Sequence, residues 1–438
     1  MNTRKIYKKW NTLYHWDQAG YFAYLPAVFI YDGDFSFEFY DDLGFRSKEF
    51  TKEYRGTRIN KYHTGPAVLL SPFYAIGHAV AIKRGEPLNG FSEPYKHLVT
   101  LGCLFYVAIG FLFLRRLLLR YFSDPITALT LLALAFGTNL LYYASHEGLM
   151  SHAYSFFLFA ALLFSGVKYV EDRRKWALLI TGFIAGLIAA TRLPNGLVFL
   201  IPFLWGVQHW KGVGERFVRL GQDWPWALGA LVLFVIGMSP QLAYAYAQTG
   251  HWLINSYEGE HFYFGQPLFG KILWSYRKGW LVYTPMMLFA LVGFAWLKKY
   301  CAPAFWGVSI YLILHLYLIS CWGVWWYGGS FGMRTMVESY AVLSLPLACF
   351  LHHFLQVPIR RYWFVALFPW LIGLNLLQTH QYSRGIIHHD SMTKKAYWTV
   401  FGHIHPIHPE VKADMKKHTS FPNYKKANRD PNYRRKMK

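Results

Sequence analysis

The chain has 438 residues, of which 54% are hydrophobic, 20% aromatic and only 16% charged. A soluble protein of this length would normally form two or three domains with far more charge, so the composition excludes an ordinary soluble enzyme. The formal net charge is +22, but Lys and Arg are spread over short connections and the polar tail. Retention beside an anionic membrane explains this distribution better than nucleic-acid binding.

The chain opens with MNTRKIYKKWNT, which contains no apolar run. Neither a signal peptide nor a leading transmembrane helix is therefore visible there. The next segment, WDQAGYFAYLPAVFIYDGDF (16–35), predicts a short interfacial helix that ends near Pro26. At its start, Asp17 fits a general base at a membrane face and equally a helix N-cap. The YDGD stretch with Asp32 and Asp34 predicts a turn, with a metal or second-acid role as the alternative.

Residues 66–82, PAVLLSPFYAIGHAVAI, are apolar enough for a membrane span. Counting them as a span would invert every later loop and break the charge rule for loops. We therefore expect this segment to lie along the outer interface or to dip into it.

A bilayer is crossed by roughly 17–25 apolar residues, and the sequence predicts about ten such helices. They lie near 97–114, 126–144, 150–168, 177–191, 194–208, 226–246, 281–297, 303–321, 335–355 and 362–378. The expected fold class is all-α, a polytopic helical membrane protein. Its domains would be an extracytoplasmic region with short interfacial helices (1–96), a transmembrane region (97–378) and a polar basic tail (379–438).

Lys and Arg are concentrated in alternate connections, which the positive-inside rule places in the cytoplasm. These connections hold Arg115, Arg116, Arg120, Lys168, Arg173, Arg174, Lys175, Lys211, Arg216, Arg219, Lys298, Lys299, Arg360 and Arg361. The first loop, the loop from Gln248 to Trp280 and the connection WGVWWYGGSFGMR then face outward. The expected location is a bacterial inner membrane, with the site on the extracytoplasmic side.

The hairpin YASHEGLMSHAYS (143–155) brings His146, Glu147 and His152 within about two helical turns. Such a group could hold a phosphate, orient a base or bind a metal, or its imidazoles could simply cap helix ends. The stretch HEGLMSH lacks the HExxH spacing, which disfavours a zinc hydrolase.

Cations form the third candidate set, because Arg and Lys suit a phosphate and Arg can bind it through two hydrogen bonds. They are Arg192 in ATRLPNG, Arg277 and Lys278 in SYRKGW, and Arg334 after WWYGGSFG. The rings of Trp325 and Trp326 could contact a sugar, as could Tyr21, Tyr24 and His63 near the first loop. The alternative is that Arg334 serves only to pair with Glu338 at i, i+4.

The tail contains HIHPIHP, which could bind a metal through His403, His405 and His408 or form an extended surface strip. Its last twenty residues are expected to be mobile. Four cysteines (Cys103, Cys301, Cys321, Cys349) lack metal spacing and are interpreted as small core residues. No metal site is predicted, no cofactor is indicated with certainty, and a divalent metal stays an open alternative.

With these motifs the chain resembles the GT-C integral-membrane glycosyltransferases, in particular bacterial relatives of protein O-mannosyltransferases and aminoarabinose transferases. The likeness rests on WDQAGYFAYLP, KYHTGPAVLLSPF, SHEGLMSH, RLPN, RKGWLVYTP and WWYGGSFGMR in this order. Members of that family begin with a transmembrane helix before the catalytic loop, and this sequence shows none.

The resemblance implies a polyprenyl-phosphate-linked sugar donor and a glycan, lipid or protein acceptor outside the cytoplasm. It implies Asp17 as the base of an inverting transfer, Arg192, Arg277, Lys278 and Arg334 at the donor phosphate, and Glu147 and His152 in support. Two other functions stay open. A transporter for lipid-linked sugars would need charges at the midplane and related halves, whereas these charges lie at one face without a repeat. The other is a non-catalytic membrane subunit.

Overall fold

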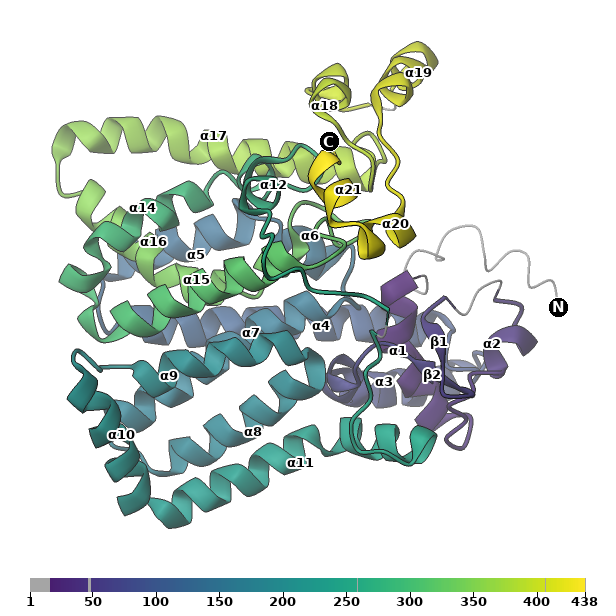
Figure 1. The fold of residues 1–438 in the computed structure, drawn as a ribbon, viewed down its shortest axis with the longest axis horizontal. Coiled ribbons are helices and arrows are strands. Elements are labelled where there is room, and N and C mark those ends of the chain that lie inside the picture. The colour runs from purple at the N-terminus through teal and green to yellow at the C-terminus, as the bar shows by residue number, and fades with distance from the viewer. Residues whose placement is uncertain (1–15, 46–48, 258, 406, 438) are drawn as a thin grey trace. The chain divides into compact units, whose positions relative to one another are not determined.

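The computed structural model describes residues 16–45, 49–257, 259–405 and 407–437, and the prediction about the first dozen residues lies outside this part. Regular structure in the described residues is almost entirely helical, which confirms the all-α prediction (Figure 1). The strands β1 (Thr51–Tyr54) and β2 (Thr57–Asn60) form one antiparallel hairpin with Thr51 opposite Asn60.

The chain divides into two compact units, each built from three segments. The first unit comprises Met1–Gly110, Tyr143–Gly196 and Arg219–Glu258, and the second comprises Phe111–Tyr142, Leu197–Val218 and Gly259–Lys438. Besides the hairpin, the first unit holds α1 (Trp16–Phe29), α2 (Phe39–Asp42), α3 (Gly65–Arg84), α7 (Ser151–Val170), α8 (Trp176–Thr191) and α11 (Trp224–Thr249). Residues of both units occur in α4 (Glu93–Leu118), α6 (Leu140–Ser145), η2 (Leu193–Phe199) and α10 (Trp210–Gln222).

The second unit contains the remaining helices, most of them from the C-terminal half of the chain. They are α5 (Asp124–Phe136), α9 (Leu200–Leu204), α12 (Phe269–Trp274), α13 (Trp280–Tyr283), α14 (Met287–Tyr300), η3 (Ala302–Ala304), α15 (Phe305–Cys321), η4 (Arg334–Met336), α16 (Tyr340–Phe354), α17 (Pro358–Ser383), α18 (Lys394–Val400), α19 (Pro409–His418), α20 (Tyr424–Arg429) and α21 (Pro431–Lys436).

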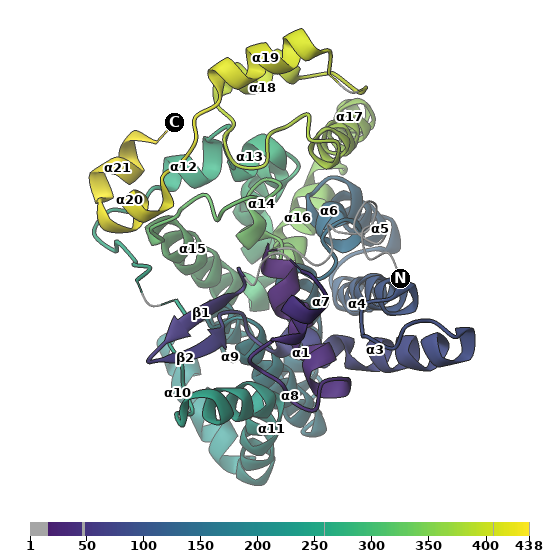
Figure 2. The ribbon, with the colours of Figure 1, turned by 90° about the vertical axis from the view of Figure 1, so that its right-hand side faces the viewer.

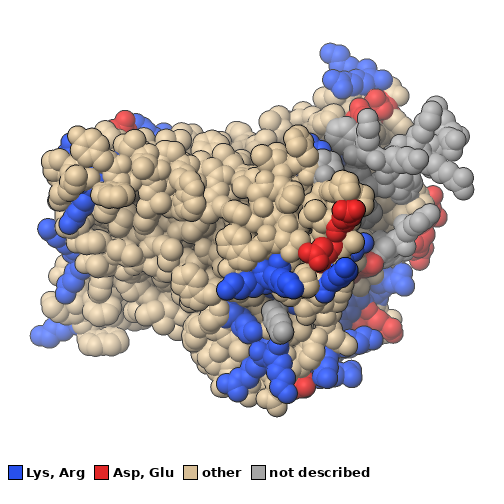
Figure 3. Space-filling model, turned by 90° about the horizontal axis from the view of Figure 1, so that it is seen from above, with Lys and Arg blue, Asp and Glu red and all other residues tan. Residues whose placement is uncertain are grey.

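Six helical segments of the described chain have the length and hydropathy of membrane spans. They are Gly65–Arg84, Glu93–Leu118, Ser151–Val170, Trp224–Thr249, Ala302–Cys321 and Pro358–Ser383, and four shorter apolar helices accompany them. Figure 3 shows a broad uncharged surface beside groups of Lys and Arg, which is the surface that lipid-embedded helices require. The protein is an integral, multi-pass membrane protein.

Several predicted spans are interrupted helices rather than continuous ones. The predicted span 126–144 is broken between α5 and α6, where Asn139 Nδ2 donates to the carbonyl of Phe331 at 2.9 Å. The predicted span 281–297 is broken between α13 and α14 at Thr284 and Pro285. A proline lacks the amide hydrogen that continues a helix, so an apolar run alone overestimated helix length here.

In the first unit, α8 and α11 pack closely because small residues face each other. A Cβ added to Gly182 or Gly186 of α8 would clash with the backbone carbonyls of Ala230 and Phe234, respectively. A Cβ on Gly237 would lie 2.6 Å from the carbonyl oxygen of Phe183. Membrane helices associate through such small residues, because lipid provides no hydrophobic drive between helices.

The segment predicted to lie along the interface forms α3, one continuous helix of 20 residues. Its length and hydropathy alone would also fit a span. Figure 2 shows α3 from the side, whereas α8 and α11 of the same unit are seen along their axes. Within the first unit α3 therefore runs across these helices, and its place along the interface stays a prediction.

The prediction that the last twenty residues are mobile is wrong for the residues up to 437. Arg434 in α21 has no exposed surface and donates to the carbonyls of Ser320 at 3.1 Å, Trp322 at 2.9 Å and Gly323 at 3.2 Å. The polar composition of this stretch suggested mobility. In the structure, Arg434 instead donates to backbone carbonyls of the same unit and thereby anchors the stretch.

Candidate functional site

One segment of the first unit, residues 61–66 (KYHTGP), connects most of the candidate residues of that unit. The hydroxyl of Tyr62 donates to Oδ1 of Asp17, the residue near the start of α1 that is half-buried. The ring of Tyr62 lies over Gly20, where an added Cβ would clash with it, and 5.0 Å from the ring of Tyr21. Only glycine at position 20 allows the ring to come this close to α1.

The backbone of Tyr62 is held by hydrogen bonds on both sides. The hydroxyl of Tyr24 donates to the carbonyl of Tyr62 at 2.6 Å, and Asn60 Oδ1 accepts from the amide of Tyr62 at 3.0 Å. Asn60 Nδ2 in turn donates to the carbonyl of Gly20 at 2.7 Å. The buried rings of Tyr21 and Tyr24, predicted to contact a sugar, thus support Tyr62 in this structure.

The next residue of the same segment is His63, whose pKa is affected by the charge of Arg192. Burial and the nearby Arg192 guanidinium lower the pKa of His63 to about 4, so the imidazole is neutral at neutral pH. Gly65 follows, and a Cβ there would lie 2.7 Å from Cα of Thr191, the residue before Arg192. This close approach fixes the start of α3 against the end of α8.

Arg192 is oriented by His152, a buried residue of α7. Arg192 Nη1 lies 2.9 Å from His152 Nδ1. A guanidinium only donates hydrogen bonds, so this ring nitrogen is an acceptor and the imidazole is neutral. The ring of Tyr143 packs edge-on at 5.6 Å and completes the surroundings of His152. The sequence predicted that His152 and Glu147 would support catalysis. In this structure His152 orients the guanidinium of Arg192.

The predicted hairpin exists between α6 and α7, with Glu147 in its turn. The carbonyl of Glu147 accepts from the amide of Met150 at 2.9 Å, and its side chain is half-buried. The hydroxyl of Tyr154 donates to the carbonyl of Gly148 at 2.5 Å and fixes the turn to α7.

The YDGD stretch is a turn, as predicted. Gly33 has a φ of +82°, and Asp34 Oδ1 accepts from the amide of Ser36 at 2.9 Å. Asp34 Oδ2 also accepts from the amide of Glu38 at 3.1 Å, so the carboxylate stabilises the turn in which it lies.

In the second unit, Arg277 and Lys278 are each only 1% exposed and donate to backbone carbonyls. Arg277 binds the carbonyls of Asp390 and Ser420, the latter at 2.7 Å, and Lys278 binds those of Ser330 and His389. Burial lowers the pKa of Arg277. Both cations therefore hold residues 389–420 of the tail, a role that the sequence pattern did not suggest.

The Trp-rich connection of the same unit lies beneath this tail. Trp325 and Trp326 have no exposed surface, and the ring of Tyr424 packs 5.4 Å from that of Trp326. The Arg277 guanidinium lies 5.8 Å from the centre of the Trp326 ring. Arg334 is half-buried in η4 and Glu338 is buried. In this structure neither tryptophan ring is open to a sugar.

The described residues contain no group of three or more His, Cys, Asp or Glu side chains that could hold a metal ion. One position of the HIHPIHP stretch, residue 406, lies outside the described chain. The four cysteines are buried and form no disulfide with one another in the described part of the chain.

The residue that sequence reasoning missed is Tyr62. It stands within a motif that was singled out, but only its neighbour His63 was chosen. Burial and the Asp17 carboxylate raise the pKa of Tyr62 well above its usual value, so its hydroxyl stays a donor. No local signal marks a partner 45 positions away in the sequence.

No family model matches the chain, and no curated protein does. Among solved structures, the chain is similar to ArnT from Cupriavidus metallidurans in the apo state, with a TM-score of 0.50 and 15% identity over 84% of this chain. The same protein bound to undecaprenyl phosphate gives a TM-score of 0.48 at 14% identity. The match spans 60% of the ArnT chain in each case. The chain therefore has an ArnT-like fold, as the GT-C resemblance of its motifs implies.

Proposed function

We propose that the protein is a glycosyltransferase that moves a sugar from a polyprenyl-phosphate donor to an acceptor hydroxyl at the extracytoplasmic face of a membrane. The observation that carries this proposal is that residues 61–66 of the first unit reach both charges: Tyr62 donates to Asp17, and Gly65 lies against Thr191, the residue before Arg192. The segment links a carboxylate to a guanidinium, which are the two charges that such a transfer needs. The GT-C fold and the ordered motifs support it.

In the proposed step, the Asp17 carboxylate takes the proton of the acceptor hydroxyl. The acceptor oxygen forms a bond to the anomeric carbon, and the bond from that carbon to the phosphate oxygen breaks. Its electron pair stays on the polyprenyl phosphate, and attack from the opposite side inverts the anomeric configuration. A carboxylate has two oxygens with about four acceptor sites, so the Tyr62 bond uses only part of its capacity.

Arg192 is proposed to stabilise the departing phosphate, because a guanidinium fits phosphate oxygens and is already oriented by His152. Arg334 is kept as a second candidate. Arg277 and Lys278, predicted for the same role, are instead assigned to the tail because their donors meet backbone carbonyls. Glu147 is proposed to support the hairpin that carries His152. A divalent metal is not required by this scheme.

The test compares Asp17→Asn with Asp32→Asn in cells that otherwise lack the protein. Asp32 is an exposed turn residue with a φ of +50°, a conformation that Asn tolerates, so the control makes the same chemical change away from these contacts. Mass spectrometry of surface glycans should show one sugar lost with Asp17→Asn and kept with Asp32→Asn. A positioned base typically contributes about 10²–10⁴ in rate. Undiminished glycan in an abundant Asp17→Asn protein contradicts the mechanism.

The alternatives predict other results. A transporter would move lipid-linked sugar across reconstituted vesicles without transfer, and a non-catalytic subunit would tolerate Asp17→Asn. The sidedness is tested with a membrane-impermeant thiol reagent, for which the four buried native cysteines give little background. We expect labelling from outside for Trp16→Cys and none for Lys175→Cys. The reverse pattern contradicts an extracytoplasmic site.

A further inference from the structure

The second unit contains an open cavity of about 1320 Å³ between α12, the start of α18, the end of α19 and α21. None of its lining residues belongs to the site proposed for sugar transfer. Its walls come from three stretches of sequence, residues 267–276, 393–395 and 417–437. The cavity thus exists only because the tail docks on α12.

The charge of this cavity is entirely positive in the described structure. Its lining includes Lys271, Lys394, Lys395, Lys417 and Lys436 together with His418, and no Asp or Glu among the described lining residues. All of these lysines except Lys271 are exposed, and within the described chain no carboxylate pairs with them. Ammonium groups facing one cavity repel each other, and an anion in the cavity would relieve this repulsion.

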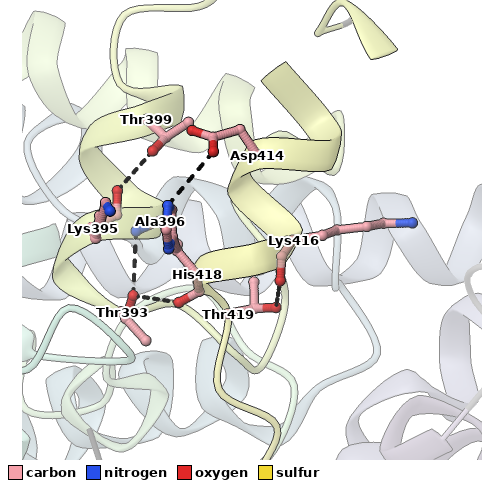
Figure 4. A network of polar contacts seen from close by, with 8 residues as sticks. All are labelled: Thr393, Lys395, Ala396, Thr399, Asp414, Lys416, His418 and Thr419. Carbon is pink, nitrogen blue, oxygen red and sulfur yellow. Dashed lines mark hydrogen bonds and ion pairs between the residues drawn. The ribbon is translucent and has the colours of Figure 1, made fainter. Parts of the chain in front are cut away.

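The walls are held in place by specific hydrogen bonds. Lys271 Nζ donates to the carbonyl of Met437 at 2.5 Å, which ties α12 to the end of α21. Thr393 Oγ1 donates to the carbonyl of His418 at 2.7 Å and accepts from the amide of Ala396 at 3.3 Å, which ties α18 to α19 (Figure 4). Asp414 lies 3.6 Å from His418 and outside the lining. The lysines are therefore carried on a fixed frame.

Exposed rings stand beside the lysines at this cavity. Trp274 is 54% exposed, Phe269 40% and Phe421 71%, and all three line it. Aromatic rings next to lysines are the combination that binds the interface of an anionic membrane, with the rings among the acyl boundary and the ammonium groups at the phosphates. A free phosphate ion would use the lysines but would leave the rings in water.

We propose that this cavity binds the phosphate headgroup of an anionic membrane lipid. Lys394, Lys395 and Lys417 contact the phosphate, and Trp274 and Phe421 contact the adjoining acyl region. The lipid then bridges α12 and the tail. This proposal does not depend on the proposed transferase activity, because it involves other residues.

The test uses the purified full chain in neutral detergent and counts bound lipid by native mass spectrometry. Phosphatidylglycerol and phosphatidylcholine with the same acyl chains are offered at equal concentration. We expect wild type to bind phosphatidylglycerol about tenfold more tightly, and Lys394→Gln/Lys395→Gln/Lys417→Gln to lose most of that preference. The matched control is Lys412→Gln/Lys416→Gln/Lys425→Gln. It removes three exposed tail lysines that do not line the cavity, and Figure 4 shows Lys416 pointing away from α18.

Equal binding of the two lipids to wild type overturns the proposal, and this comparison needs no variant to fold. Equal losses in the two triple variants also overturn it, because total charge would then explain the binding. Inorganic phosphate is added as a competitor at about millimolar concentration, far below what screening alone would require. Displacement of the lipid by it supports recognition of the phosphate group. Binding of inorganic phosphate without any preference for phosphatidylglycerol overturns the assignment to lipid.

Discussion

The hydroxyl of Tyr62 donates a hydrogen bond to the carboxylate of Asp17. This bond joins the segment that follows β2 to the first turn of α1. The bond fixes the direction of a carboxylate that is half-buried at the first turn of a helix. It also explains why Gly20 is needed one turn further on, where the tyrosine ring lies.

Removing this hydroxyl should impair transfer without removing the base. We expect Tyr62→Phe to lower kcat by about tenfold to a hundredfold, less than the loss of Asp17, because the carboxylate remains but is no longer oriented. The measurement is transfer from a polyprenyl-phosphate sugar with purified protein. Tyr31→Phe is the matched control, since its hydroxyl donates to the carbonyl of Asn89 at 3.2 Å in the same unit. Equal activity of Tyr62→Phe and wild type would remove the positioning role.

A methyl group at position 20 should have a related effect. Gly20→Ala places a Cβ against the ring of Tyr62 and 2.9 Å from Cβ of Phe50, so the ring must move. We expect a loss of about 1–3 kcal/mol in stability together with reduced transfer. Gly221→Ala, at a helical position with open space around it, should instead keep or slightly raise the thermal midpoint. Equal midpoints for both variants would show that the ring does not depend on Gly20.

The stability of the first unit should fall in acid because of His63. Its pKa is 6.5 in the unfolded chain and about 4 in the folded protein, so between these values the unfolded state binds more protons. The stabilisation is complete above pH 6.5 and is lost as the pH falls toward about 4. The thermal midpoint of wild type in detergent should drop between about pH 7.5 and about pH 4.5. His63→Asn should show a smaller drop, and an equal one would assign the effect to other groups.

Arg434 and Arg435 are adjacent and offer a matched pair for the docked tail. Arg434 is fully buried and meets several carbonyls, whereas Arg435 is exposed. We expect Arg434→Ala to weaken docking by about 1.5–3 kcal/mol, since hydrogen bonds from a charged donor are lost and buried carbonyls are left unpaired. Chymotrypsin should then cut at Phe421, Tyr424 and Tyr433 faster than in wild type. Arg435→Ala should be cut at the wild-type rate, and the same rate in both variants would contradict the buried anchor.

Apolar runs were sufficient to predict a polytopic helical protein. A membrane helix forms its backbone hydrogen bonds within itself and crosses the bilayer with about twenty apolar residues, which are visible in the sequence. They could not predict the break at Asn139, whose side chain donates to the distant carbonyl of Phe331. The break at Thr284 and Pro285 had a local signal in the proline, which the length of the apolar run concealed. The prediction that α3 lies along the interface comes from loop charge, because its hydropathy alone would also fit a span.

Some residues of the candidate site could be predicted from the sequence, but the contacts between them could not. Asp17, His152 and Arg192 stood out because ionisable groups are rare in an apolar sequence. Tyr62 did not, since tyrosine is common in this chain and its partner lies far away. The cations Arg277 and Lys278 looked like ligands for phosphate, and only the structure shows that carbonyls of the tail already bind them.

Arg277 and Lys278 can make their contacts with the tail only late in biosynthesis. Arg277 leaves the ribosome more than a hundred residues before the carbonyls of Asp390 and Ser420 that accept from it, and Lys278 does so more than a hundred residues before the carbonyl of His389. Until those acceptors are translated, the two side chains must stay hydrated, and the Trp-rich connection next to them cannot close. We expect the second unit to mature only after synthesis of the tail, so that a premature stop codon near position 388 would yield a chain degraded by quality control.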